Sequence, residues 1–277
     1  MSAEGTDTNN STQRLLADDE PVPFVIMNGE STLPILLVCD HASRRIPAVL
    51  GTMGLDPFAR RCHLALDIGA GALTEGLAGR LSATAVLGQY SRLVVDCNRL
   101  LMDPSAFLEF GDGIVVPGNR NLHPEDKKAR ADEIYWPYHN AVESQVERLS
   151  AAERPPIFVA VHSFTPVLNG ESRSWEIGVL WDTDRVTAEI LLHDLRAAGF
   201  QVGDNEPYSG KAPHDFTVDH HAESIGLPHV GLEIRQDLID DERGVAEICE
   251  ILQRVIASLP ARLNPTDIST RQPQLPA

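Results

Sequence analysis

Short runs of apolar residues, spaced along most of the chain, are the clearest pattern in this sequence. The runs that are rich in β-branched and aliphatic residues cover 24–28, 34–40, 84–90, 92–98, 157–164, 176–181 and 229–235. Several are almost continuously apolar, which is typical of central strands covered on both faces. The pattern therefore predicts a sheet whose middle strands are buried.

Between these runs, apolar residues recur at helical spacing. The predicted helices cover about 57–80, 124–149, 184–198 and a segment after residue 238. We expect Pro137 to bend the second helix, because proline lacks the backbone donor that a helix interior needs. Strands that alternate with helices predict an α/β fold, a three-layer sandwich with a central mixed, largely parallel sheet.

No linker divides the chain, so we expect a single α/β domain over residues 21–262. Residues 1–20 are polar and acidic and resemble a disordered tail more than a signal peptide, and residues 263–277 read as a loose C-terminal tail. Two long irregular stretches, at about 103–123 and 203–226, are loop candidates that we expect to shape a site.

Charge narrows the range of partners. The 277 residues carry a net charge of −17, which disfavours nucleic acid and anionic membranes because both repel such a surface. A small anionic substrate needs only a local cationic pocket. No apolar run approaches the roughly 18 residues of a spanning helix. The four cysteines form no CxxC pair, so we expect a reduced, cytoplasmic protein. Nothing in the pattern indicates an oligomeric state.

Polar and charged residues stand at the ends of four predicted strands. Ligands bind beyond the carboxyl ends of strands in open α/β sheets, and buried charges are usually paired or functional. We therefore expect one site to gather these side chains. They are Asp40, His41, Asn98, Arg99, His162, Glu233 and Arg235.

The two strand-end imidazoles suggest a metal. Zinc binds imidazole nitrogen and carboxylate oxygen, and His41, His162 and the adjacent Asp40 offer these donors. On an ideal strand Asp40 would point away from His41, but an irregular strand end could turn both inward. The alternative is that His162 is a hydrogen-bonded core residue and that His41 caps a turn.

Glu233 is the candidate catalytic base. Its neighbours Leu232 and Ile234 indicate partial desolvation, which raises the pKa of a carboxylic acid toward the range useful for proton transfer. Arg99 and Arg235 could hold a substrate carboxylate through paired hydrogen bonds, and Asn98 could fix a carbonyl. Alternatively, Glu233 forms a structural salt bridge and the arginines balance internal acids.

Two further clusters contain histidine. His63 and Asp67 are spaced i, i+4 on a predicted helix, which suits either a metal or a hydrogen-bonded pair. We expect Asp67 near the site, as a substrate-binding residue, and leave His63 open. His214, His220 and His221 lie in a polar stretch that is either a source of ligands or an exposed loop.

At these residues the chain resembles the N-formylglutamate amidohydrolase family. The matching stretches are "CDHASRRIP", "LDIGAGAL", "SRLVVDCNR", "VHSFTP", "YSG" and "LEIRQDLI", in their expected order between about residues 35 and 255. The resemblance implies a compact α/β fold like that of zinc carboxypeptidases. It also implies hydrolysis of an N-formyl or similar N-acyl amino acid.

The arrangement is also distantly similar to the aspartoacylase-type zinc deacylases. Their histidine ligands match His41 and His162, their Asp-x-Asn-Arg signature matches "DCNR" at 96–99, and their base matches Glu233. Those enzymes carry a glutamate ligand three positions after the first histidine, where this chain has Arg44. Either Asp40 or Asp67 completes the set here, or the metal site is altered or lost.

These observations lead to one hypothesis and two alternatives. The hypothesis is a metal-dependent amidohydrolase, with Zn²⁺ or another divalent ion, that converts N-formyl-L-glutamate to formate and glutamate. Glu233 moves the proton, while Arg99, Asn98, Arg235 and Asp67 contact the substrate. The alternatives are a deacylase of a different N-acyl amino acid or amide, and a non-catalytic small-molecule-binding relative that has lost its metal.

Overall fold

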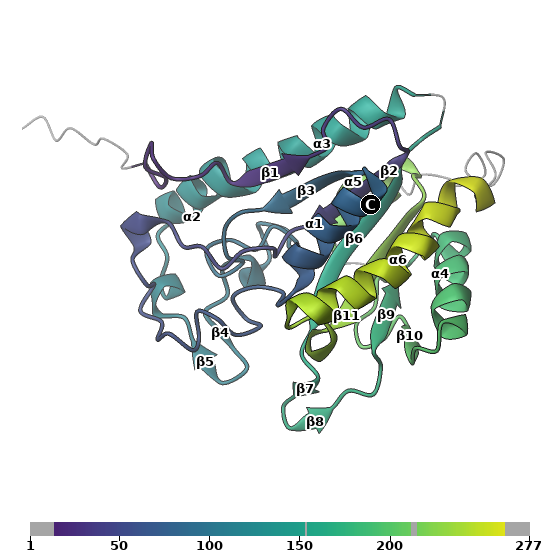
Figure 1. Ribbon diagram of the computed structural model, residues 1–277. Coiled ribbons are helices and arrows are strands. Elements are labelled where there is room, and N and C mark those ends of the chain that lie inside the picture. The colour runs from purple at the N-terminus through teal and green to yellow at the C-terminus, as the bar shows by residue number, and fades with distance from the viewer. Residues whose placement is uncertain (1–13, 153, 212–214, 264–277) are drawn as a thin grey trace, which may run out of the picture.

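A central sheet of seven strands lies between two layers of helices (Figure 1). The computed structural model describes residues 14–152, 154–211 and 215–263. The strand order is β1-β3-β2-β6-β11-β9-β10. The strands of this sheet are β1 (Phe24–Met27), β2 (Ile35–Cys39), β3 (Thr84–Gly88), β6 (Ile157–Phe164), β9 (Ile177–Leu180), β10 (Val202–Asp204) and β11 (His229–Arg235).

The middle of the sheet is parallel and its margins are mixed. Strands β3, β2, β6 and β11 pair in parallel, whereas β1 runs antiparallel to β3, and β9 runs antiparallel to β11. Every residue of β2 and β6 is buried, as expected for strands covered on both faces. The predicted three-layer α/β class with a mixed, largely parallel sheet is confirmed.

The helices divide into two layers because alternate residues of a strand face opposite sides. Leu36 and Val38 of β2 belong to the core beneath α3, while Ile35 and Leu37 belong to the core beneath α1, α4 and α6. The α-helices are α1 (Ala70–Leu81), α2 (Pro124–Arg130), α3 (Trp136–Ser150), α4 (Arg185–Ala197), α5 (Phe216–His221) and α6 (Glu242–Arg262).

Shorter elements occupy the connections. A π-helical turn, η4 (Ala131–Tyr135), joins α2 to α3 immediately before Pro137, at the place where we expected a distortion. Two small hairpins stand outside the main sheet, β4–β5 (Phe110–Gly111 and Ile114–Val115) and β7–β8 (Val167–Leu168 and Glu171–Ser172). The 3-10 turns are η1 (Ala48–Leu50), η2 (Pro104–Phe107), η3 (Pro117–Asn119), η5 (Glu223–Ile225) and η6 (Gln236–Leu238).

Two predicted elements are wrong. The helix expected over 57–80 begins only at Ala70, and residues 57–69 form turns. Gly69 has φ +80°, and a Cβ there would lie 2.2 Å from the backbone oxygen of Ile239, so the chain turns sharply before α1. The strand expected over 92–98 is also absent, and those residues form turns beside the sheet. The short strand β10 was not predicted.

The structure describes only part of the two predicted tails. Residues 1–13 and 264–277 of the predicted tails lie outside the described residues. Residues 14–20 differ from the expected disorder: Leu15 and Leu16 are buried, and their backbone N–H groups donate to the Glu133 carboxylate at 2.7 and 2.9 Å. The division into one domain stays a prediction. None of the described helices has the length and apolar character needed to cross a membrane.

Candidate active site

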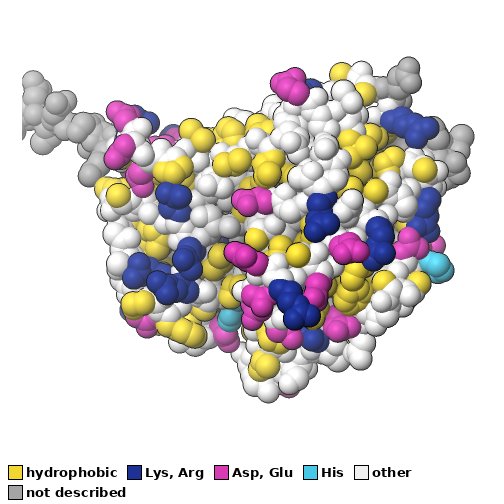
Figure 2. Space-filling view, in the orientation of Figure 1, with side chains coloured by type: hydrophobic (Ala, Val, Ile, Leu, Met, Phe, Trp, Pro, Cys, Tyr) yellow, Lys and Arg dark blue, Asp and Glu magenta, His cyan; other side chains and the backbone are white. Residues whose placement is uncertain are grey.

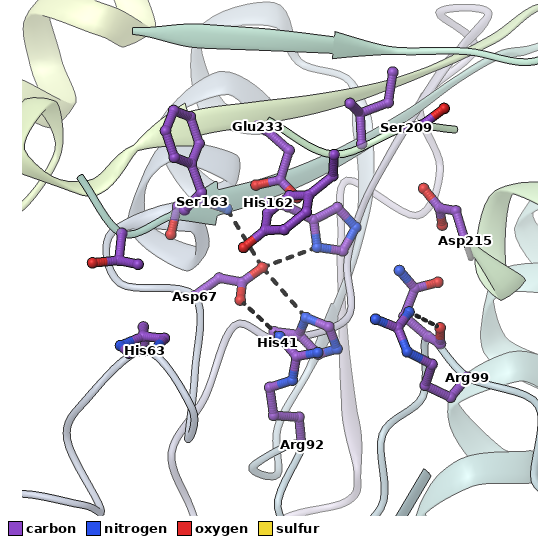
Figure 3. Close-up of a pocket in the computed structure, with 15 residues that line it drawn as sticks. His41, His63, Asp67, Arg92, Arg99, His162, Ser163, Ser209, Asp215 and Glu233 are labelled. Carbon is purple, nitrogen blue, oxygen red and sulfur yellow. Dashed lines mark hydrogen bonds and ion pairs between the residues drawn. The ribbon is translucent and has the colours of Figure 1, made fainter. Parts of the chain in front are cut away.

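Three adjacent parallel strands bring the central side chains together. His41 lies just beyond the carboxyl end of β2, His162 lies in β6, and Glu233 lies in β11. Glu233 and His162 are register partners across the β6–β11 pair, so their side chains share one face of the sheet. All three side chains are buried and line one pocket (Figure 3).

Asp67 stands between the two imidazoles. Its Oδ2 lies 3.3 Å from Nδ1 of His41 and 2.9 Å from Nδ1 of His162. The backbone N–H of Ser163 also faces Oδ2, at 3.4 Å, and the Asp67 N–H donates to the His41 carbonyl at 3.0 Å. Asp67 reaches this place on the turns before α1, and not on a helix face beside His63 as we expected.

A second carboxylate lies behind His41. Oδ1 of Asp96 is 2.7 Å from Nε2 of His41, and the other oxygen accepts from Arg92 at 2.7 and 3.1 Å. Arg92 also approaches Asp67 at 3.4 Å (Figure 3). One guanidinium therefore links both carboxylates that contact His41. Burial acts to raise the pKa of Asp96, but Arg92 and His41 outweigh it and hold that pKa well below its usual range.

Asp40, predicted as a metal ligand, lies on the far side of His162. Its Oδ2 is 3.7 Å from Nε2 of His162, too long for a hydrogen bond, while Oδ1 accepts hydrogen bonds from the hydroxyls of Tyr138 and, at 3.1 Å, Thr217. Asp40 is buried and does not line the pocket. The carboxylate that lies between the two histidines is therefore Asp67.

The electrostatics of the cluster follow from its burial. Burial lowers the pKa of His162, but the hydrogen bond to Asp67 and the surrounding carboxylates outweigh that effect and raise it to about 10. The same imidazoles hold the pKa of Asp67 below its usual range despite burial. Burial raises the pKa of Glu233 to about 8, with Asp67 and Asp215 adding to the rise.

The pocket around these groups has a volume of about 390 Å³. Asn98 and Arg99, predicted as substrate contacts, line it, and the Asn98 side-chain oxygen accepts from the N–H of Thr217 at 3.0 Å. Arg235 does not line it: its guanidinium bonds the Asp237 carboxylate at 2.7 and 3.2 Å. The complete lining is His41, His63, Asp67, Arg92, Asn98, Arg99, His162, Ser163, Phe164, Thr165, Leu180, Tyr208, Ser209, Asp215 and Glu233.

A known protein family matches most of this chain. The family model described as N-formylglutamate amidohydrolase matches residues 33–240. The chain belongs to the N-formylglutamate amidohydrolase family. It is therefore an amidohydrolase, and the resemblance inferred from the sequence is confirmed. A comparison with curated proteins found no match.

Two solved structures are similar to this chain over most of its length. The gene product Atu2144 from Agrobacterium tumefaciens is 35% identical, with a TM-score of 0.86 over 90% of this chain and 98% of that one. The N-formylglutamate amidohydrolase from Ralstonia eutropha JMP134 is 18% identical, with a TM-score of 0.68 over 87% of this chain and 98% of that one. The second similarity shows a shared fold.

The buried donors of this amidohydrolase suit a metal ion. One donor atom from each of His41, Asp67 and His162 lies within 4.8 Å of the others, and imidazole with carboxylate is a donor set that zinc accepts. Oε2 of Glu233, which lines the same pocket, is buried without a hydrogen-bond partner among the described residues. A buried polar atom without a partner is costly, so this region can accommodate a cation and its ligands.

The other histidines of the amidohydrolase fall into different places. His63 lines the pocket, and its Nε2 lies 3.2 Å from Asp112. His220 stacks on Phe216, while His221 shares a 2.9 Å hydrogen bond with His139. His214 lies outside the described residues.

Three residues of this site were not predicted individually, namely Arg92, Tyr208 and Asp215. Arg92 lies four residues before Asp96, and the two side chains form an ion pair. This spacing was the signal in the sequence that could have indicated the pair. Asp215 and Tyr208 also line the pocket, from the long irregular stretch that we expected to shape a site. No local pattern marks Asp215, because its placement depends on how that stretch folds over β11.

Proposed function

We propose that this protein hydrolyses the amide bond of an N-formyl or other N-acyl amino acid, with N-formyl-L-glutamate as the first candidate substrate. The products would be formate and glutamate. The observation that carries the proposal is the buried His41–Asp67–His162 cluster beside Glu233, inside a pocket of about 390 Å³. Membership in the N-formylglutamate amidohydrolase family supports the substrate class.

We assign the metal ligands to His41, Asp67 and His162. A divalent ion, with zinc as the first candidate, would supply Lewis acidity toward water and the acyl carbonyl. Asp96 contacts the His41 nitrogen that faces away from Asp67, at 2.7 Å, which orients the ring. Asp40 lies behind His162 at 3.7 Å, which is too long for a hydrogen bond, so we assign it no orienting role.

Glu233 is the proposed proton carrier. Its carboxylate takes a proton from the attacking water and gives it to the leaving nitrogen as the amide C–N bond breaks. A base whose pKa is raised to about 8 by burial is matched to this exchange near neutral pH. A nearby cation would favour the charged carboxylate, so metal binding and the basic form of Glu233 support each other.

Substrate recognition falls to the cationic and amide side chains of the pocket. Arg99 lines the pocket and is a donor for a substrate carboxylate, and Asn98 adds an amide beside it. Arg92 also lines the pocket, but its guanidinium bonds Asp96 and approaches Asp67, so we assign it to holding the cluster. We leave Arg235 out of the proposed contacts because it lies outside the pocket lining.

The experiment measures formate and free amine released from N-formyl-L-glutamate by the purified protein. A panel of N-formyl and N-acetyl derivatives of glutamate, aspartate and glutamine tests the acyl and side-chain preference. We expect chelation to abolish turnover and added zinc to restore it. Full activity after rigorous metal stripping would contradict the metal assignment, and release from none of the panel would contradict the proposed function.

We also place the protein in the cytoplasm. The cysteines Cys39, Cys62, Cys97 and Cys249 are all free thiols, which suits a reducing compartment. Fractionation of the source cells with an antibody against the chain tests this location.

A further inference from the structure

A second pocket, which we call the cationic pocket, lies apart from the active site. It has a volume of about 220 Å³ and is lined by Arg44, Ile46, Gly51, Arg60 and Arg61. None of these residues lines the active-site pocket. Figure 2 shows one group of Lys and Arg side chains close together at the left of the molecule.

The three guanidiniums of this pocket lack acidic partners among the residues that the structure describes. No ion pair or side-chain hydrogen bond joins Arg44, Arg60 or Arg61 to another residue in the described part of the chain, and Nε of Arg60 is buried without a partner. Asp56, four residues before Arg60, accepts instead from the N–H of Ala59 at 2.8 Å.

This arrangement is unusual for so acidic a protein. The chain has 40 acidic and 23 basic residues, so carboxylates to neutralise three arginines are in surplus. Three positive charges around one hollow repel each other, and a buried donor without a partner is destabilising. Both costs fall when an anion occupies the hollow.

We propose that the cationic pocket binds a small oxyanion that carries more than one negative charge. Guanidinium groups form paired hydrogen bonds with phosphate and carboxylate oxygens, and three such groups suit a ligand with several acceptor oxygens. A phosphate-bearing and a polycarboxylate ligand share this chemistry. This site goes beyond the proposed amide hydrolysis.

The position of the pocket also accounts for Arg44. The segment from His41 to Ile46 and the segment from Asp56 to Asp67 each contribute to both pockets. His41 and Asp67 face the active site, while Arg44 and Arg61 face the cationic pocket. Arg44 thus belongs to the second pocket, although it occupies the sequence position of a metal-binding glutamate in related deacylases. An anion held there ties together the two segments that position His41 and Asp67.

The test is calorimetric titration of the full-length protein with inorganic phosphate and, separately, with citrate. Ionic strength is held constant with sodium chloride, and no amide substrate is present, so the result does not depend on the proposed function. We expect saturable binding of at least one anion. Arg44→Gln and Arg61→Gln should each weaken it by roughly tenfold, because each removes charged hydrogen bonds.

Two matched variants separate this site from other sources of binding. Arg254→Gln removes an exposed arginine of α6, and Arg99→Gln removes a cation of the active-site pocket. Both should leave the affinity unchanged, and circular dichroism melts establish that every variant is folded. Binding of phosphate alone or citrate alone assigns the ligand. Absence of binding to both, equal weakening in the Arg254 or Arg99 variant, or full affinity in the Arg44 and Arg61 variants would overturn the proposal.

Discussion

The active site has a strand-borne half and a loop-borne half, and the two are held in different ways. His162 and Glu233 lie on neighbouring strands, where the backbone pairing of β6 and β11 sets their separation. Asp67 and Asp96 lie in turns, where side-chain hydrogen bonds to His41 and Arg92 set their positions. His41, at the end of β2, joins the halves.

The two halves differ in the interactions that fix the positions of their side chains. A register is kept by many backbone hydrogen bonds, so loss of one side chain leaves the other strand-borne groups in place. The loop-borne half relies on side-chain contacts between distant segments, such as the 2.7 Å contact of Asp96 with His41 and the 2.9 Å contact of Asp67 with His162. We therefore expect loss of Glu233 to change the chemistry and leave the other groups in place, and substitutions in the loop-borne half to change metal affinity and stability.

Loss of Glu233, the proposed base on β11, should have the largest effect. Glu233→Gln keeps the shape of the side chain and removes the proton acceptor, so kcat for formate release should fall by roughly 10²- to 10⁴-fold. Zinc content should stay near that of the unaltered protein, because Glu233 is outside the His41–Asp67–His162 cluster. The control is Glu250→Gln on the exposed side of α6. Unchanged turnover in the Glu233 variant would remove its role as base.

Loss of an outer carboxylate of the loop-borne half should act on the metal. Asp96→Asn weakens the contact that orients His41, and such partners typically change metal affinity by roughly 10- to 100-fold. Competition with a chromophoric zinc chelator measures the affinity without any substrate. Asp19→Asn, at an exposed position, serves as the control. Equal zinc affinity in both variants would contradict the assignment of Asp96.

A smaller effect is expected where α5 meets the strand end of β2. Thr217→Val removes the hydroxyl that donates to Asp40 at 3.1 Å while nearly keeping the shape. The free energy of unfolding should fall by about 1–3 kcal/mol, the usual cost of leaving a buried acceptor with fewer partners. Urea denaturation provides the measurement, with the exposed Thr52→Val as control. If the two variants unfold at the same urea concentration, this contact contributes nothing to stability.

The smallest expected effect concerns pH. Burial lowers the pKa values of His139 and His221, which share a hydrogen bond between α3 and α5, to about 3. Between about pH 6.5 and 3 the unfolded chain therefore binds more protons than the folded one, and this contribution to stability falls as pH falls.

The matching experiment follows urea midpoints from pH 7 to pH 5. His139→Gln should flatten the decline, because one buried histidine no longer titrates, whereas Asn140→Gln, at an exposed position of the same helix that does not titrate, should leave it as it is. An unaltered slope in the His139 variant would show that this pair does not control the pH dependence.

The parts of the site that could be predicted are those with a local signal. His41, His162 and Glu233 follow or interrupt apolar runs, and the ends of such runs meet at one edge of a parallel sheet. The role of Asp67 could not be predicted in this way. The His63–Asp67 spacing suggested a helix face, yet Gly69 ends the turns only two residues later and α1 begins at Ala70.

The same limit explains the errors in the fold. Residues 92–98 have the composition of a strand, but that segment makes turns in which Arg92 pairs with Asp96. An apolar run indicates that a segment is buried, and the partners that it meets decide its backbone conformation. Arg44 is a further case in which the sequence position misled. That position suggested a change in the metal site, but in the structure Arg44 lines the cationic pocket.

The sequence by itself determined the α/β class, the buried central strands and the two histidines and glutamate that those strands carry. Periodicity and strand ends encode these features within a few residues of each position. The tertiary structure alone decided that Asp67 lies between the histidines, that Asp40 lies behind His162, and that three arginines meet in a second pocket. Those placements come from contacts between segments far apart in the chain, for which a local pattern holds no signal.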